Sequence, residues 1–90
     1  TRAHDWGLVS EVVAQAELLE RAKTIARTIA SRAPIAAETA KINLKAAFSM
    51  PVEKAIEYER DLQTICFATA DAIEGRAAFK EKRPPVFRRR

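Results

Sequence analysis

Prolines divide this chain into short segments, and these boundaries constrain its fold more than any other feature of the sequence. Proline fixes its own φ angle and lacks a backbone N–H, so it ends a helix or stands at the start of the next one. Pro34, Pro51 and the pair Pro84–Pro85 each follow a stretch in which apolar residues recur with helical spacing. We therefore predict a succession of short helices.

The segment from about Gln15 to Arg32 has a clear helical period, with mainly charged residues outside its apolar stripe. The stripe consists of Leu18, Leu19, Ala22, Ile25, Ala26, Ile29, Ala30 and Ala33. Pro34 ends this helix, and a second helix is predicted from about Ile35 to Phe48. Its stripe is rich in small residues, which would let another helix approach closely: Ala36, Ala40, Leu44 and Ala47.

Two further helices complete the predicted fold. One runs from about Val52 to Ala68 or Thr69 and is apolar around much of its girth, which is typical of a helix covered on more than one side. Asp71 as N-cap, with Glu74 three residues later, is close to a capping box and predicts the other helix from about Ala72 to Lys82. Gly75 inside that helix indicates close packing or a close backbone approach.

The predicted class is all-α, a small bundle of about four helices. Residues 1–13 are interpreted as the end of a helix, capped by Gly7, followed by an extended connector or edge strand. Residues 14–90 contain the helices and a basic tail.

Composition and charge limit the classes of function. A chain of 90 residues makes one small domain and buries only about 60–65% of the surface that its unfolded state exposes. The single Cys66 permits no internal disulfide or cysteine metal cluster, so a cytoplasmic, reducing location is expected. No apolar run approaches the roughly 18 residues of a membrane span, so no membrane partner is expected.

The formal net charge of +4 is concentrated at the end of the chain. Residues 76–90 contain seven Lys or Arg and one Glu, a net charge of +6. Such a segment should attract an anionic partner. Nucleic acid is not the expected one, because the two longest predicted helices carry mixed charge rather than a basic face. Three terminal arginines are usually solvated and mobile.

Four single residues invite a functional interpretation and have structural alternatives. Glu59 lies inside an apolar stripe, and we expect it to pair with an arginine rather than to act in catalysis. His4, the only histidine, is expected at the surface, Cys66 as a small core residue and Trp6 as a plug at the edge of a core. No Gly-rich phosphate loop, G-x-S-x-G or H-E-x-x-H motif occurs, and no metal site is expected.

Five stretches, in this order, resemble the C-terminal part of an enoyl-CoA hydratase: "WGLVSEVV", "ELLERAKTIA", "APIAAETAKINLKAAF", "EKAIEYE" and "CFATADAIEGRAAFKEKRPPVF". The resemblance is to the crotonase (enoyl-CoA hydratase/isomerase) superfamily, and the ending carries its most specific part. It covers essentially the whole chain. It implies that residues 1–90 are the C-terminal helical trimerisation region of a crotonase-fold protein, and that the N-terminal ββα spiral catalytic domain is absent from them.

The resemblance also implies an activity for a parent enzyme. That enzyme, a lyase, would add water to 2-enoyl-CoA thioesters in fatty acid oxidation, with no cofactor other than coenzyme A as part of the substrate. Family members carry the oxyanion donors and catalytic glutamates in the spiral domain, so this chain is predicted to hold no catalytic residue and to be inactive alone. The helical part would cover the acyl-CoA site and self-associate, as trimers that commonly pair into hexamers.

Phe79 and Lys82 correspond to an aromatic residue and a lysine that approach CoA bound mainly by a neighbouring subunit. An aromatic face can pack against adenine, while an ammonium group meets the phosphates. Their i, i+3 spacing places both on one helix face. The alternatives are core packing for Phe79 and a solvated charge for Lys82.

The function of the whole has alternatives too. The chain could be the C-terminal part of a crotonase-superfamily isomerase or hydrolase, since the distinguishing residues lie upstream. It could also be an independent helical protein-interaction module with no enzymatic parent.

Overall fold

The computed structural model describes residues 1–90 and contains helices but no strand, so the predicted all-α class is confirmed. The prolines stand at helix boundaries as predicted. The helix Leu18–Ala30 begins three residues later than expected. None of the helices combines the length and apolar character that a membrane span requires. The helices are α1 (Arg2–Asp5), α2 (Leu18–Ala30), α3 (Pro34–Ala47), α4 (Val52–Phe67) and α5 (Ala70–Glu81).

Gly7 ends α1 as predicted. Its φ of 73° lies in the left-handed region, which glycine reaches without a steric penalty. The Gly7 N–H donates to the His4 carbonyl and the Leu8 N–H to the Ala3 carbonyl, both at 2.9 Å. These two bonds form a Schellman motif. Residues 8–14 then follow an irregular path, so the connector is present but the edge strand is not.

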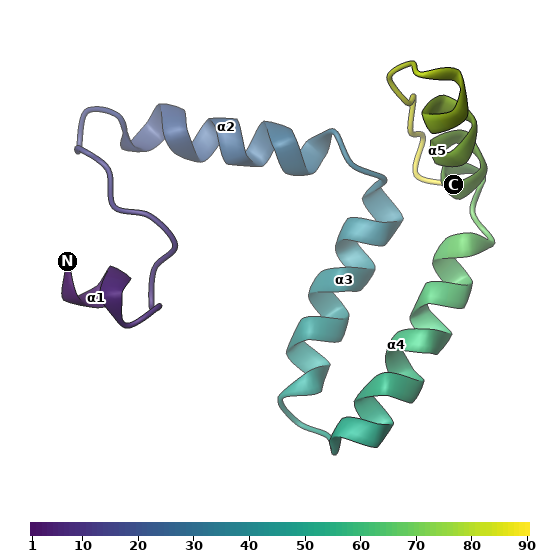
Figure 1. Cartoon of the computed structure of the whole chain (residues 1–90), viewed down its shortest axis with the longest axis horizontal. Helices are drawn as coiled ribbons and strands as arrows, with labels where there is room; N and C mark the ends of the chain where they lie inside the picture. The colour runs from purple at the N-terminus through teal and green to yellow at the C-terminus, as the bar shows by residue number, and fades with distance from the viewer.

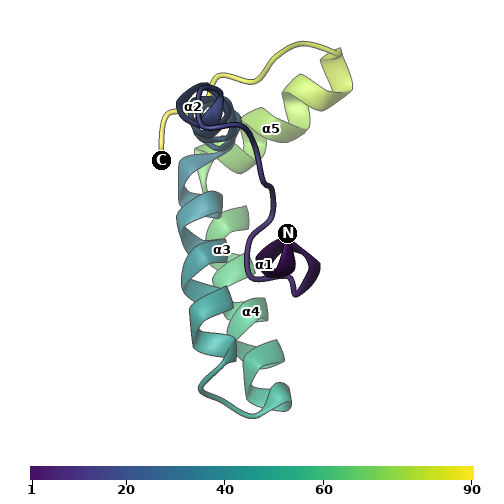
Figure 2. The ribbon, with the colours of Figure 1, turned by 90° about the vertical axis from the view of Figure 1, so that its left-hand side faces the viewer.

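The helices α3 and α4 form an antiparallel hairpin and lie side by side (Figure 1). The small side chains of Ala36 and Ala40 on α3 face α4 across a shared groove. The prediction that these residues would admit another helix is therefore confirmed. The helix α2 leaves this hairpin at a steep angle, and in Figure 2 it is seen nearly end-on above α3. It forms no extended packing with another helix.

The chain encloses almost no core of its own. Only Asp71 and Ala78 are buried. The accessible surface is 7615 Å², whereas a compact monomer of 10.0 kDa should expose about 5,200 Å². The radius of gyration is 16.7 Å, against about 12 Å for a compact domain of this length. The apolar stripes of α2 and α4 therefore lie open, with exposed Leu18, Leu19, Ile25, Ile29, Val52, Ile56, Ile65 and Phe67.

Sequence analysis expected two residues, Trp6 and Cys66, to contribute to a core, and they differ in exposure. Trp6 is 67% exposed, so its predicted role as a plug is wrong within this chain. It instead lies beneath the Arg2 guanidinium, whose carbon is 4.8 Å from the ring centroid. Cys66 is half-buried between α3 and α4, as a small packing residue would be.

The last helix begins earlier than predicted. Thr69 is extended, and its hydroxyl accepts a hydrogen bond from the Ala72 N–H at 3.1 Å, so Thr69 is the N-cap of α5. The prediction that Asp71 caps this helix is wrong, and the Asp71 carboxylate is available for another task. After Lys82 the chain reverses, and residues 83–90 run back along α5 (yellow in Figure 1). We call residues 83–90 the C-terminal strap.

Candidate functional site

Phe79 and Lys82 lie together at the C-terminal end of α5. The Lys82 Nζ atom is 4.9 Å from the centroid of the Phe79 ring, a cation–π distance. Phe79 is 77% exposed, so it is not a core residue of this chain. The pair thus presents an accessible aromatic face and a positive charge at one place.

Lys82 holds an unusual backbone conformation, with φ 57° and ψ 37°. The Lys82 N–H donates to the Phe79 carbonyl at 3.3 Å, and the Arg83 N–H donates to the Ala78 carbonyl at 3.0 Å. These are the bonds of a Schellman motif, which usually has glycine at the left-handed position. A lysine there costs on the order of 1 kcal/mol, so surrounding contacts must hold it in place.

Glu74 supplies such contacts from α5. Its carboxylate receives two hydrogen bonds from the Arg83 guanidinium, at 2.6 and 3.0 Å, and a third from the Val86 N–H at 2.8 Å. The Arg83 bonds, followed by the Val86 N–H, lower the pKa of Glu74 to about 2. Arg83 also donates to Glu81 at 2.6 Å, and the two carboxylates raise its pKa.

Asp71 holds the far end of the strap. Its buried carboxylate accepts hydrogen bonds from the Arg88 N–H at 2.7 Å and the Arg89 N–H at 2.8 Å. The Asp71 N–H in turn donates to the Arg90 carbonyl at 2.9 Å. The Arg89 guanidinium reaches α3, where it pairs with Glu38 at 3.0 Å and lowers the pKa of that carboxyl. The expectation of a solvated, mobile tail is therefore wrong for the strap backbone.

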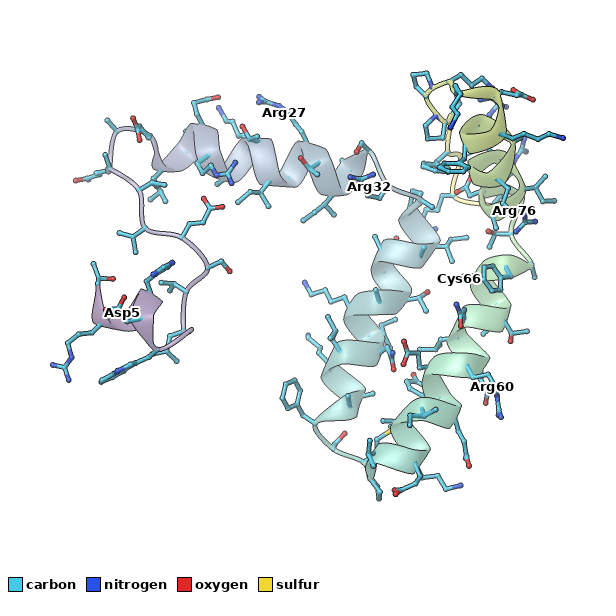
Figure 3. All side chains as sticks on the ribbon, in the orientation of Figure 1. Asp5, Arg27, Arg32, Arg60, Cys66 and Arg76 are labelled. Atoms are coloured by element: carbon cyan, nitrogen blue, oxygen red, sulfur yellow. The ribbon has the colours of Figure 1, made fainter.

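The groove between α3 and α4 has a volume of about 520 Å³. Glu59 lies at its edge, is exposed and makes no ion pair, so the predicted pairing with an arginine is wrong within this chain. Figure 3 places Cys66 on the α4 side that faces α3 and Arg60 on the opposite, outer side.

No group of His, Cys, Asp or Glu could hold a metal ion. His4 is at the surface as predicted, 3.8 Å from Asp5.

Comparison with known proteins places these features in a family. The family described as Enoyl-CoA hydratase/isomerase matches residues 1–90. A carnitinyl-CoA dehydratase of Escherichia coli K12 is 39% identical over 89 residues, which is 94% of this chain and 34% of the dehydratase.

The chain is also similar to solved structures of enoyl-CoA hydratases. The chain superposes on an enoyl-CoA hydratase of Bacillus anthracis with a TM-score of 0.95 and 35% identity, covering 99% of this chain and 34% of that one. An enoyl-CoA hydratase/isomerase of Mycobacterium paratuberculosis gives a TM-score of 0.94 and 36% identity, and the match covers 99% of this chain and 35% of that one. The chain thus spans about a third of the length of these relatives.

Proposed function

Because the chain belongs to the enoyl-CoA hydratase/isomerase family, we propose that it is the C-terminal helical part of an enzyme that adds water to 2-enoyl-CoA thioesters in fatty acid oxidation. The observation that carries the proposal is the match over residues 1–90, together with relatives named as hydratases. The dehydratase among the relatives is named for the loss of water from a CoA thioester, which is the same chemistry in reverse.

The chemical step would take place outside residues 1–90. Addition of water to an enoyl thioester builds negative charge on the thioester oxygen, which preorganised N–H donors stabilise. Carboxylates would deliver the water and the proton. The carboxylates of α5 are unsuited to that task, because Glu74 and Asp71 are already occupied by the strap.

The first task of this part would be to hold the nucleotide end of CoA bound mainly by a neighbouring subunit. The exposed ring of Phe79 offers a face for adenine, and the Lys82 ammonium offers a point charge for the phosphates. Their closeness, 4.9 Å between ammonium and ring centroid, supports a shared ligand. The net charge of +6 on residues 76–90 would favour the approach of this anion.

The second task would be assembly, as a trimer that pairs into a hexamer, and coverage of the acyl-CoA site. The exposed surface exceeds that of a compact monomer by about 2,400 Å², about three times the roughly 800 Å² that each partner buries in a standard interface. The open apolar stripes of α2 and α4 are the surfaces that this assembly would cover. Exposed apolar patches of this extent are typical of interaction sites.

Two alternatives make different predictions. An independent helical interaction module would need a closed core, and a structure with two buried residues disfavours it.

An isomerase or hydrolase of the same superfamily would share this part but process the thioester differently. A full-length enzyme with this chain as its C-terminal third should be given crotonyl-CoA. Hydration removes the enoyl thioester absorbance without releasing free thiol, whereas thiol release would support a hydrolase. An isomerase would leave crotonyl-CoA unchanged and would shift the double bond of a 3-enoyl-CoA substrate.

A further inference from the structure

The C-terminal strap is fastened to α5 at two points on one helix face. Glu74 accepts from the Val86 N–H, and Asp71, three residues earlier, accepts from the N–H groups of Arg88 and Arg89. Residues three apart on a helix are neighbours on its surface. The strap therefore runs antiparallel to α5, and Glu74 is the fastening point nearer to the reversal at Lys82.

The reversal has little freedom once that point is fixed. Pro84 and Pro85 have fixed φ angles, and Pro84 disfavours a helical conformation at Arg83. The Arg83 guanidinium is clamped to Glu74 by two bonds, and the Val86 N–H by one. The change of direction between α5 and the strap is therefore concentrated at Lys82, which takes the left-handed conformation.

We infer that Glu74 is a positioning residue for Lys82: by holding Arg83 and Val86, it fixes the left-handed turn that keeps the Lys82 ammonium beside the Phe79 ring. Glu74 does not itself reach the ligand, because its oxygens are taken by the strap. Its effect on CoA affinity rests on the proposed function of the Phe79–Lys82 pair. The fixed turn itself is a property of the chain and does not depend on that function.

Glu81 provides a matched control. It also pairs with Arg83, at 2.6 Å, and carries the same charge, but it holds no strap backbone group. Glu74→Gln and Glu81→Gln therefore remove the same charge near Lys82. Only the first should free the strap.

The first measurement is amide hydrogen exchange in a full-length enzyme that carries this chain, resolved at the N–H groups of Lys82, Arg83 and Val86. In Glu74→Gln these exchange rates should rise about tenfold, because loss of a charge-assisted hydrogen bond is worth roughly that factor. Glu81→Gln should leave them unchanged. Unchanged protection of Lys82 and Arg83 in Glu74→Gln, with Val86 released, would overturn the inference. Arg83→Gln is a second variant, which removes the clamp while Glu74 still accepts from Val86, and it should loosen Lys82 as well.

The second measurement is kinetic, in a full-length enzyme that carries this chain. Glu74→Gln should raise KM for crotonyl-CoA about 3- to 10-fold with kcat little changed, since the chemical groups are untouched. KM for the crotonyl thioester of pantetheine, which lacks the nucleotide, should not change. Equal KM changes for the two substrates would mean that Glu74 stabilises the structure as a whole and does not position Lys82 at the nucleotide. This result would overturn the inference. A loosened turn with no KM change for either substrate would instead remove the CoA role of Phe79 and Lys82, and with it this part of the proposed function.

Discussion

The ring of Phe87 lies against the backbone of Gly75, with its Cε1 atom 3.6 Å from the position that a Cβ at residue 75 would occupy. Glycine was expected to mark close packing, and this contact confirms it. A separation of 3.6 Å is an ordinary van der Waals distance, so one methyl group fits without moving Phe87. Because glycine in a helix interior costs about 1 kcal/mol relative to alanine, Gly75→Ala should stabilise the protein by up to about that amount. Thermal unfolding in a full-length enzyme carrying the chain measures the difference.

A larger side chain at the same position should have the opposite effect. Gly75→Val adds two branches where Phe87 lies, and the ring would have to leave the helix surface. Faster amide exchange at Arg88 and Arg89 would report the displaced strap, while Gly75→Ala serves as the matched control. A valine variant with fully protected strap amides would show that Phe87 has another place to pack.

The pKa of Glu74 predicts how the strap responds to acid. Hydrogen bonds from Arg83 and Val86 lower this pKa from its ordinary value near 4.5 to about 2. The ionised carboxylate thus stabilises the strap fully above about pH 4.5, and this stabilisation is lost as the pH falls from there through about 2. The side-chain carboxyl carbon of Glu74, followed by NMR, should titrate near pH 2. Titration near 4.5 would mean that the clamp does not form in solution.

Local patterns predicted the helices well because local causes produce them. Pro34 and Pro51 fix boundaries by removing an N–H donor, and Gly7 ends α1 by its freedom to take a positive φ. The resemblance in turn identified the family from the order of five stretches. These signals require no knowledge of distant contacts.

The strap could not be predicted in the same way. Asp71 and Glu74 have the spacing of a helix start, and a capping box explains both without reference to residues a dozen or more positions away. In the structure, Thr69 caps α5, and the two carboxylates bind the strap backbone instead. The signal that would have indicated the strap is an acidic pair near a helix start, followed by a proline pair and a basic segment that can turn back along the helix.

The predicted environments of Trp6 and Glu59 were wrong for a related reason. An apolar stripe shows that a face is suited to burial but not whether the same chain covers it.

Self-association is expected for the isolated chain. The apolar residues left open on α2 and α4 have no cover within residues 1–90. At tens of micromolar, light scattering should give a mass above the monomer value of 10.0 kDa, and a dye for exposed apolar surface should bind. Ile25→Glu, at the centre of the α2 stripe, should reduce the mass, while Arg27→Glu on the charged side should not. A sharp monomer without dye binding would favour the independent helical module.

The isolated chain should not hydrate crotonyl-CoA. Its carboxylates are held by the strap, paired with basic side chains or exposed at the surface, and the oxyanion donors are proposed to lie outside residues 1–90. The measurement is the loss of enoyl thioester absorbance at high chain concentration. The full-length enzyme is the positive control. Turnover that persists through purification and follows the 90-residue chain would contradict the expectation.

Phe79 and Lys82 should contribute to CoA binding rather than to the chemical step. Lys82→Ala removes a solvent-exposed charge contact, so its cost should be about 0.5–1 kcal/mol, a two- to five-fold rise in KM that shrinks at high salt. Phe79→Ala removes an exposed aromatic face, and its effect should be larger and nearly independent of salt. In both variants kcat should be almost unchanged, because the lost interaction is equal in the ground and transition states. Lys80→Ala, two residues before Lys82 on α5 and outside the pair, is the charge-matched control. The decisive comparison is KM for CoA and pantetheine thioesters in Lys82→Ala: an equal rise for both would mean that this lysine does not meet the nucleotide phosphates and is a solvated charge.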